Sequence, residues 1–175
     1  MMAESGAPTM EDLRKVVGAV TDPELPPLTL VDLGILRSVE EVDDGEATTV
    51  VVTVTPTYSG CPAVEYIEEE IAKVLDAAGC ERFRVERSLN PAWTTDWVTA
   101  DGRRKLTELG IAPPGPAAGP TPVTLGRRAP RAPVVACPRC GAVDTEVVSA
   151  FGSTACKALY RCRACSEPFD HFKAI

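Results

Sequence analysis

Several absences narrow the functions open to this sequence. One histidine, His171, occurs among 175 residues, which disfavours a histidine-rich di-iron site, a Cys2His2 zinc site and a Ser-His-Asp hydrolase. No apolar run approaches the roughly 18 residues of a transmembrane helix. Neither a G-x-G-x-x-G motif nor a P-loop is present, so no nucleotide site is expected. Residues 1–10 hold Glu4 and no basic residue, unlike a secretory signal. We therefore expect a cytoplasmic chain with no membrane segment.

The two parts of the chain differ in charge. Hydrophobic residues make up 45% and charged residues 25%, as in a folded globular protein. Residues 1–112 hold 21 acidic and 10 basic residues, a net charge of −11, whereas residues 113–175 hold 4 and 8, a net charge of +4. A general nucleic-acid binder needs a concentrated basic face. We therefore expect no nucleic-acid partner and interpret the acidic charge mainly as a solvated surface.

A segment rich in proline and glycine divides the chain. Residues 112–133 contain seven prolines and three glycines among 22 residues. Proline lacks an amide donor and glycine resists ordering, so neither suits the interior of a helix or sheet. The composition predicts a semi-rigid, partly extended linker at 113–133. It separates a body at 10–112 from a tail at 134–175.

The body has the element order of an α+β fold. Apolar residues at helical spacing predict the helices, and β-branched or alternating runs predict the strands. Thr9 is the predicted N-cap of the first helix, and Pro62 and Gly79 begin and end the longest one. Together they predict a small mixed sheet covered by helices. The predicted elements are helix Met10–Val20, strands Ile35–Val42 and Thr48–Thr55, helix Pro62–Gly79, strand Phe83–Leu89 and helix Gly102–Leu109.

Four cysteines of the tail form two C-x-x-C pairs. Cys137 and Cys140 are followed, after 21 residues, by Cys162 and Cys165. A two-residue spacer lets both thiolates of a pair reach one cation, and Gly141 permits the turn after the first pair. Four thiolates match tetrahedral zinc, and a tail of about 40 residues needs such a staple to fold. We predict a structural zinc ribbon, with rubredoxin-like iron or an iron–sulfur cluster as the alternative.

Three further cysteines lie outside these pairs. Cys61 falls where a predicted strand passes into the helix that starts at Pro62, and free amides at a helix N-terminus favour a thiolate. The acidic run that follows in the helix opposes this, so the geometry alone leaves Cys61 open between a poised thiolate and a simple cap. Cys80 is expected to be structural. Cys156 is expected to be a small buried residue, with an alternative metal-related role.

The motif order resembles a known family. In the body, residues 22–26 (DPELP), 29–34 (TLVDLG), 55–62 (TPTYSGCP) and 91–97 (PAWTTDW) are similar to the small domain of the SufT-like family, which is associated with iron–sulfur cluster assembly. With its cysteine-paired tail, the whole chain resembles the PaaD family. These are accessory proteins encoded with the bacterial phenylacetyl-CoA epoxidase subunits, called subunit J in some naming schemes.

The resemblance implies a maturation factor rather than an enzyme. It implies that the chain assists assembly or delivery of an iron–sulfur cluster, or iron, to the epoxidase system of aerobic phenylacetate catabolism. The expected partners are the epoxidase components, above all the ferredoxin-type reductase, and the iron–sulfur assembly machinery. The family's cysteine corresponds to Cys61, which would hold a transient cluster or iron, with a homodimer supplying further ligands.

Two other functions stay open on the sequence. One is a non-catalytic structural subunit of the oxygenase complex. The other is a thiol enzyme using Cys61, which is disfavoured because no histidine base or adjacent resolving cysteine accompanies it.

The family's acidic motif corresponds to Asp22 and Glu24. These carboxylates are expected either to orient a basic side chain of the client or to cap a turn after Pro23. The aromatic residues of the motifs, Trp93 and Trp97 with Tyr58, are expected either to line the Cys61 site or to pack in the core.

Overall fold

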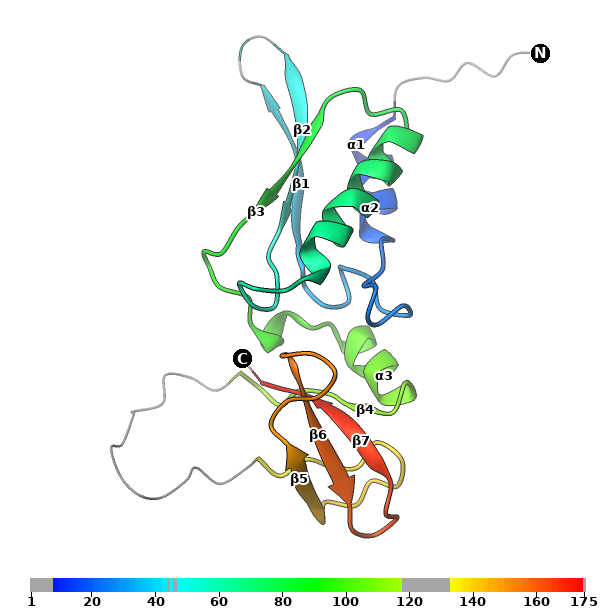
Figure 1. Ribbon diagram of the computed structural model, residues 1–175. Helices are drawn as coiled ribbons and strands as arrows, with labels where there is room; N and C mark the ends of the chain where they lie inside the picture. The colour runs from blue at the N-terminus through cyan, green and yellow to red at the C-terminus, as the bar shows by residue number, and fades with distance from the viewer. Residues whose placement is uncertain (1–7, 44, 46, 118–132, 175) are drawn as a thin grey trace, which may run out of the picture. The chain divides into compact units, whose positions relative to one another are not determined.

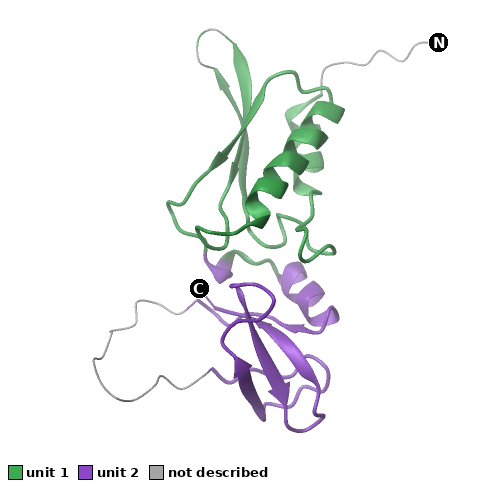
Figure 2. Cartoon of the chain, in the orientation of Figure 1, with its two compact units in different colours: residues 1–93, 97–99 green, residues 94–96, 100–175 purple. Residues whose placement is uncertain are grey.

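The computed structural model describes residues 8–43, 45, 47–117 and 133–174 (Figure 1). Its contacts separate two units (Figure 2): unit 1 comprises residues 1–93 and 97–99, and unit 2 comprises residues 94–96 and 100–175. Each unit has a β-sheet of its own. In the described part of the chain, no helix has the length and apolarity needed to cross a membrane.

Unit 1 is built on a three-stranded mixed sheet of order β1-β2-β3. Strand β1 (Leu36–Asp43) pairs antiparallel with β2 (Thr48–Val54), and β2 pairs parallel with β3 (Phe83–Arg87). The β-branched sequence of β2 suits the central position, and Val52 and Val54 are fully buried there. The predicted small mixed sheet is therefore confirmed.

Two helices pack beside this sheet (Figure 1). Helix α1 (Met10–Gly18) begins with a capping box, in which the Thr9 hydroxyl accepts from the Asp12 amide and the Asp12 carboxylate accepts from the Thr9 amide, both at 3.2 Å. Helix α2 (Ala63–Ala77) crosses from β2 to the parallel strand β3 and buries Ile67, Ile71 and Leu75 among others. The predicted apolar stripe of α2 thus faces the core.

The ends of α2 differ slightly from the sequence prediction. The helix begins at Ala63, so Pro62 is its N-cap and not its first helical residue as predicted, although its backbone is already in the αR region. At the other end Gly79 has φ +81°, which lets the chain leave the helix in a left-handed turn and donate from Cys80 N to Leu75 O.

Unit 2 contains helix α3 (Ala100–Glu108) and a four-stranded sheet of order β4-β7-β6-β5. Tyr160 and Phe169 stack at 5.8 Å between ring centroids inside its small core. The predicted strand material at Val147 and Val148 lies in β5. The strands are β4 (Ile111–Ala112), β5 (Thr145–Ser149), β6 (Lys157–Cys162) and β7 (Pro168–Phe172).

The contacts of residues 100–112 differ from the predicted division of the chain. Strand β4 pairs parallel with β7, so that Ile111 lies opposite Asp170 and Ala112 opposite His171. These contacts group α3 and β4 with the ribbon, although they precede the predicted linker. Residues 118–132, most of that linker, lie outside the described residues, and the predicted limits 10–112, 113–133 and 134–175 stay a prediction.

Candidate metal centre and cysteine loop

The four paired cysteines of unit 2 come together. The Sγ atoms of Cys137, Cys140, Cys162 and Cys165 all lie within 4.8 Å of one another. The Cys137–Cys165 and Cys140–Cys162 sulfur distances are 3.8 and 3.6 Å, far beyond a disulfide bond. A zinc–sulfur bond of about 2.3 Å gives a tetrahedral sulfur–sulfur edge of about 3.8 Å. The four sulfurs therefore stand at the spacing that one tetrahedral cation requires.

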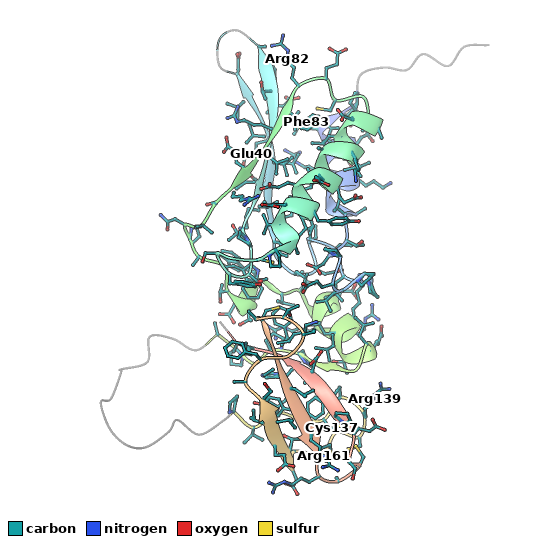
Figure 3. The ribbon with its side chains drawn as sticks, in the orientation of Figure 1. Glu40, Arg82, Phe83, Cys137, Arg139 and Arg161 are labelled. Atoms are coloured by element: carbon teal, nitrogen blue, oxygen red, sulfur yellow. The ribbon has the colours of Figure 1, made fainter. Side chains whose placement is uncertain are left out.

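Two similar turns hold the sulfurs in place. In the first, Gly141 N donates to Cys137 O at 2.9 Å and Cys137 N donates to Ala142 O at 2.9 Å. Gly141 has φ +75°, as the sequence predicts for the residue that closes this turn. In the second, Cys162 N donates to Glu167 O at 2.9 Å. Figure 3 shows Cys137 with the neighbouring side chain of Arg139.

Backbone amides and neighbouring thiols set the charge of the cluster. A hydrogen bond from the Cys165 amide, with help from the Ala164 amide, lowers the pKa of the Cys162 thiol to about 7. The Glu167 amide acts in the same direction on Cys165, but burial and hydrogen bonds with the other thiols outweigh it and raise the pKa of Cys165 to about 12. A divalent cation bound between the sulfurs would stabilise the thiolate form of all four cysteines and so displace their protons.

Cys156 and Cys80 stand outside this cluster. Cys156 is buried, and its sulfur lies 3.0 Å from the Thr154 hydroxyl. It is not one of the four clustered sulfurs. Cys80 is buried and its thiol donates to Arg82 O at 3.6 Å, while burial raises the pKa of this thiol. Both placements agree with the structural role expected for them.

In unit 1, Cys61 lies at the junction between β2 and α2. It is half-buried in the loop that follows β2, two residues before α2 begins. Cys61 N donates to Tyr58 O at 3.2 Å, and Cys61 O accepts from Val64 N at 3.4 Å. The first residue of this loop, Thr55, is buried and donates from its amide to Ile35 O at 2.8 Å. Cys61 is thus partly exposed, and backbone hydrogen bonds hold the loop that carries it.

Cations offset part of the acidic run that follows Cys61. Arg87, at the end of β3, pairs with both carboxylate oxygens of Glu68, at 2.6 Å for Nη2 and Oε2. Lys73 pairs with Glu70 at 2.7 Å. These pairs offset two of the four glutamate charges in the acidic run that follows Cys61. The sequence gives no direct sign of the Arg87–Glu68 pair, because its members are 19 residues apart on different elements.

The two motif carboxylates have different surroundings. Asp22 is buried, and its Oδ1 accepts from Glu24 N at 2.8 Å and Leu25 N at 3.0 Å. This carboxylate caps the turn after Pro23, the second of the two roles expected for it. Glu24 is exposed. Parts for Asp22, Glu24 and Cys61 in cluster or metal transfer stay a prediction.

The motif tryptophans act in the fold of unit 1. Trp93 is buried, and its Nε1 donates to Leu33 O at 2.9 Å. Trp97 is half-buried, with the Arg37 guanidinium 3.6 Å from its ring centroid. A Cβ added at Gly34 would meet Trp97 at 2.5 Å, so the glycine is needed for this close approach. Trp93 is therefore a core aromatic, the second of its two expected roles.

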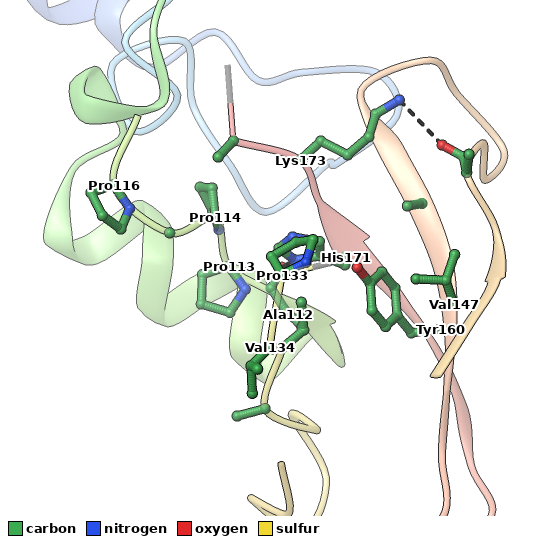
Figure 4. A pocket seen from close by; sticks show the side chains of 16 residues that line it. Ala112, Pro113, Pro114, Pro116, Pro133, Val134, Val147, Tyr160, His171 and Lys173 are labelled. Atoms are coloured by element: carbon green, nitrogen blue, oxygen red, sulfur yellow. Dashed lines mark hydrogen bonds between the residues drawn. The ribbon is translucent and has the colours of Figure 1, made fainter. Parts of the chain in front are cut away.

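An apolar groove in unit 2 was not found by sequence reasoning. It has a volume of about 860 Å³, and its wall includes Pro113, Pro114 and Pro133 (Figure 4). These prolines belong to the predicted linker at 113–133, where the composition predicts a partly extended chain.

These observations define a class of protein. It joins an α+β domain carrying a loop cysteine to a ribbon with a four-cysteine metal site. Residues 10–86 match the family described as iron-sulfur cluster assembly protein, and residues 121–173 match the PaaD zinc beta ribbon domain. The predicted zinc ribbon is thereby confirmed.

A relative matches over nearly the full length. The chain is 44% identical over 174 residues to a protein of Escherichia coli (strain K12) whose provisional name makes it one of the subunits of 1,2-phenylacetyl-CoA epoxidase. The match covers 99% of this chain and 98% of the relative. The chain therefore belongs to the PaaD family, as its motifs predict.

Shorter relatives match a little more than half of the chain. An Fe-S protein maturation auxiliary factor of Porphyromonas gingivalis (strain ATCC BAA-308 / W83) is 32% identical over 104 residues, 59% of this chain and 92% of the relative. The crystal structure of a domain of unknown function, DUF59, from Bacillus anthracis is 28% identical, covering 55% of this chain and 90% of that chain at a TM-score of 0.48.

Proposed function

We propose that this chain is an accessory factor, not an enzyme, which assists assembly or delivery of an iron–sulfur cluster, or of iron, to the phenylacetyl-CoA epoxidase system in the cytoplasm. The observation that carries the proposal is Cys61, a partly exposed thiol on anchored backbone at the start of α2. It lies within the segment that matches the iron-sulfur cluster assembly family.

In this proposal Cys61 supplies one thiolate to a transient cluster or iron ion, which is the cargo. One thiolate is too few ligands, so a second copy of the domain or the client supplies the others. A soft metal held by few protein ligands passes to the client by exchange of thiolates. Glu24, exposed beside the turn that Asp22 caps, contacts a basic side chain of the client.

The ribbon has a structural role in this proposal. The four clustered thiols hold zinc, because their sulfur spacing suits its tetrahedral bonds and zinc undergoes no redox change. The client is the ferredoxin-type reductase component, which receives the cargo made by the iron–sulfur assembly machinery. This assignment rests on the family resemblance and on the epoxidase named in the relative from Escherichia coli.

The test replaces Cys61 by serine. C61S is nearly isosteric and its residue lies in a loop, so the variant should stay folded and keep its zinc. We expect it to fail in loading the client reductase in cells, measured as iron and acid-labile sulfide per reductase molecule, with reductase activity as a second readout. The matched control is C80S in the same unit, because Cys80 is buried and its thiol donates to the Arg82 carbonyl. Full loading with C61S would contradict the proposal.

The second candidate function is a non-catalytic structural subunit of the epoxidase complex. The name of the Escherichia coli relative, which describes an epoxidase subunit, favours it. Two measurements separate these functions. A structural subunit copurifies with the complex at fixed stoichiometry, and the clusters of the complex are normal in its absence. Loss of a maturation factor instead leaves the reductase without its cluster.

A further inference from the structure

The groove of unit 2 combines an apolar wall with two unusual polar side chains. Sixteen residues line it, and Lys173 is the only one with a permanent charge at neutral pH. Tyr160 is 3% exposed and His171 is 5% exposed, and both belong to this lining. Their rings meet edge to face at 5.4 Å between centroids.

The hydrogen-bonding groups of these two residues are only partly used. His171 Nδ1 lies 3.3 Å from the Ala112 carbonyl oxygen, which can only accept, so Nδ1 carries the proton. Nε2 is then an acceptor. Among the described residues, neither His171 Nε2 nor the Tyr160 hydroxyl has a hydrogen-bond partner. Every fully buried side-chain polar atom among the described residues has a partner, so these two atoms keep some exposure, and both residues line the groove.

The groove therefore requires a donor for His171 and an acceptor for Tyr160 within an apolar ligand. A peptide backbone in extended conformation offers both groups, whereas a helix uses them internally. The rim continues into exposed apolar side chains, with Val134 81% exposed and Val147 41% exposed. A small molecule would leave these uncovered, while an extended chain would cover them.

The cation of Lys173 indicates that the ligand carries an acidic group. Lys173 lies at the rim, where its Nζ donates to Ala150 O at 3.3 Å (Figure 4). The same Nζ stands 4.5 Å from the Phe151 ring centroid. None of the described residues that line the groove is acidic. A carboxylate of the ligand can therefore pair with Lys173 at this end.

We infer that this groove binds an extended, apolar segment of the client protein that carries one acidic side chain. Its backbone N–H donates to His171 Nε2, its carbonyl accepts from the Tyr160 hydroxyl, and its carboxylate pairs with Lys173. The inference rests on the proposed function, because it concerns how the same client is held while cargo is exchanged at Cys61.

The test measures binding of the full zinc-loaded chain to purified client reductase by calorimetry. V134E should weaken binding more than tenfold, since the bound apolar segment would have to bury the new carboxylate. Y160F and H171N should each weaken it on the order of two- to tenfold through one lost hydrogen bond. Asparagine keeps a donor for the Ala112 carbonyl, and it removes Nε2 together with the edge-to-face ring contact with Tyr160. The matched control is V143E, at a valine 63% exposed outside the groove lining.

His171 supplies an independent readout because it is the only histidine. The Hε1 proton of its ring gives a single NMR signal, which should shift when the reductase is added to the wild-type chain and should not shift when it is added to V134E. Overlapping 12-residue peptides of the reductase should include one that competes for the groove and moves this signal.

Four results would overturn the inference. Three are no binding of the reductase to the wild-type chain, equal affinity for V134E and V143E, and competition by none of the peptides. The fourth is self-association of the wild-type chain that V134E abolishes, since the occupant would then be a second copy. C61S separates this inference from the proposed function: a chain that binds the reductase through the groove but loads it fully with C61S retains the docking site and loses the proposed role of Cys61.

Discussion

At the scale of single residues, hydrogen-bond partners keep the burial of polar side chains from destabilising the fold of each unit. Asp22 is buried because its carboxylate replaces solvent with two amide donors of the following turn. His171 is buried because one ring nitrogen finds the Ala112 carbonyl. In both cases the pairing decides the cost of burial, since an unpaired buried group loses its hydration without compensation.

The first residue-scale prediction concerns Asp22. D22A removes the side-chain acceptor of the Glu24 amide and one of two acceptors of the Leu25 amide, which also donates to Asp22 O at 3.3 Å. It should therefore lower the free energy of unfolding of unit 1 by about 1–3 kcal/mol, measured by urea denaturation. D22N keeps an Oδ1 acceptor and should lose less, and E24Q at an exposed position should change stability by less than about 0.5 kcal/mol. A D22A chain of normal stability that fails to load the client would instead give Asp22 a direct part in transfer.

The second residue-scale prediction concerns the protonation of His171. Burial lowers the pKa of this histidine below its usual value of 6.5, because the imidazolium loses its hydration. The unfolded chain then binds the proton first as pH falls. The stability contribution is complete above pH 6.5 and is lost as pH falls from there through the folded pKa. An NMR titration of the single histidine should give a midpoint below 6.5, and H171N should reduce the pH dependence of unfolding between pH 7 and 5. A midpoint at or above 6.5 would contradict the burial argument.

At the scale of elements, we expect the ribbon turns to depend on a cation and the helices of unit 1 to need none. The turns around Cys137 and Cys162 are closed by one or two backbone hydrogen bonds each. The core beside them is small, so we expect thiolate–metal bonds to supply much of the stability of the ribbon. Helix α1, in contrast, has a capping box and buried Leu13 and Val17.

The element-scale prediction concerns the metal. C140S or C165S should release the metal and unfold the ribbon strands β5 to β7, while unit 1 keeps its amide protection. Metal content by mass spectrometry and hydrogen exchange by segment are the measurements. C156S is the matched control, because Cys156 is buried in the same unit but is not one of the four clustered thiols. A ribbon that stays protected after complete chelation would show that its apolar core suffices.

At the scale of the whole molecule, strand pairing decides which residues fold together. Strand β4 is only two residues long, yet it pairs with β7, and Ala112 belongs to the core beside Tyr160. Arg103 on α3 donates to Pro114 O and to Thr95 O, which lie in the same unit. Residues 100–117 are therefore tied to the ribbon, although the chain enters them directly from unit 1.

The whole-molecule prediction compares fragments. A fragment ending at residue 99 keeps the bonds between Thr99 and Asp32 and should unfold with the same midpoint as one ending at residue 112. With zinc, a 100–175 fragment should fold, whereas a 134–175 fragment lacks β4 and should be less protected along β7. Circular dichroism and hydrogen exchange measure both. Clear stabilisation of the first unit by residues 100–112 would favour the domain limit at 112.

The sequence by itself determined the elements and the chemistry at short range. Capping at Thr9, the apolar stripe of α2, the β-branched run of β2 and the two C-x-x-C pairs each depend on residues within a few positions of one another. Such patterns carry their physical cause with them, because helix spacing, strand propensity and turn geometry are local properties. The motif order likewise sufficed for the family.

Only the tertiary structure decided features that join distant residues. It paired β4 with β7, placed Arg87 on Glu68, and made Trp93 a core residue by giving its indole the Leu33 carbonyl. It also turned predicted linker prolines into the wall of a groove around Tyr160 and His171. Contacts of this kind depend on which surfaces exclude water together, and no local pattern specifies a partner 59 residues away, as for His171 and Ala112.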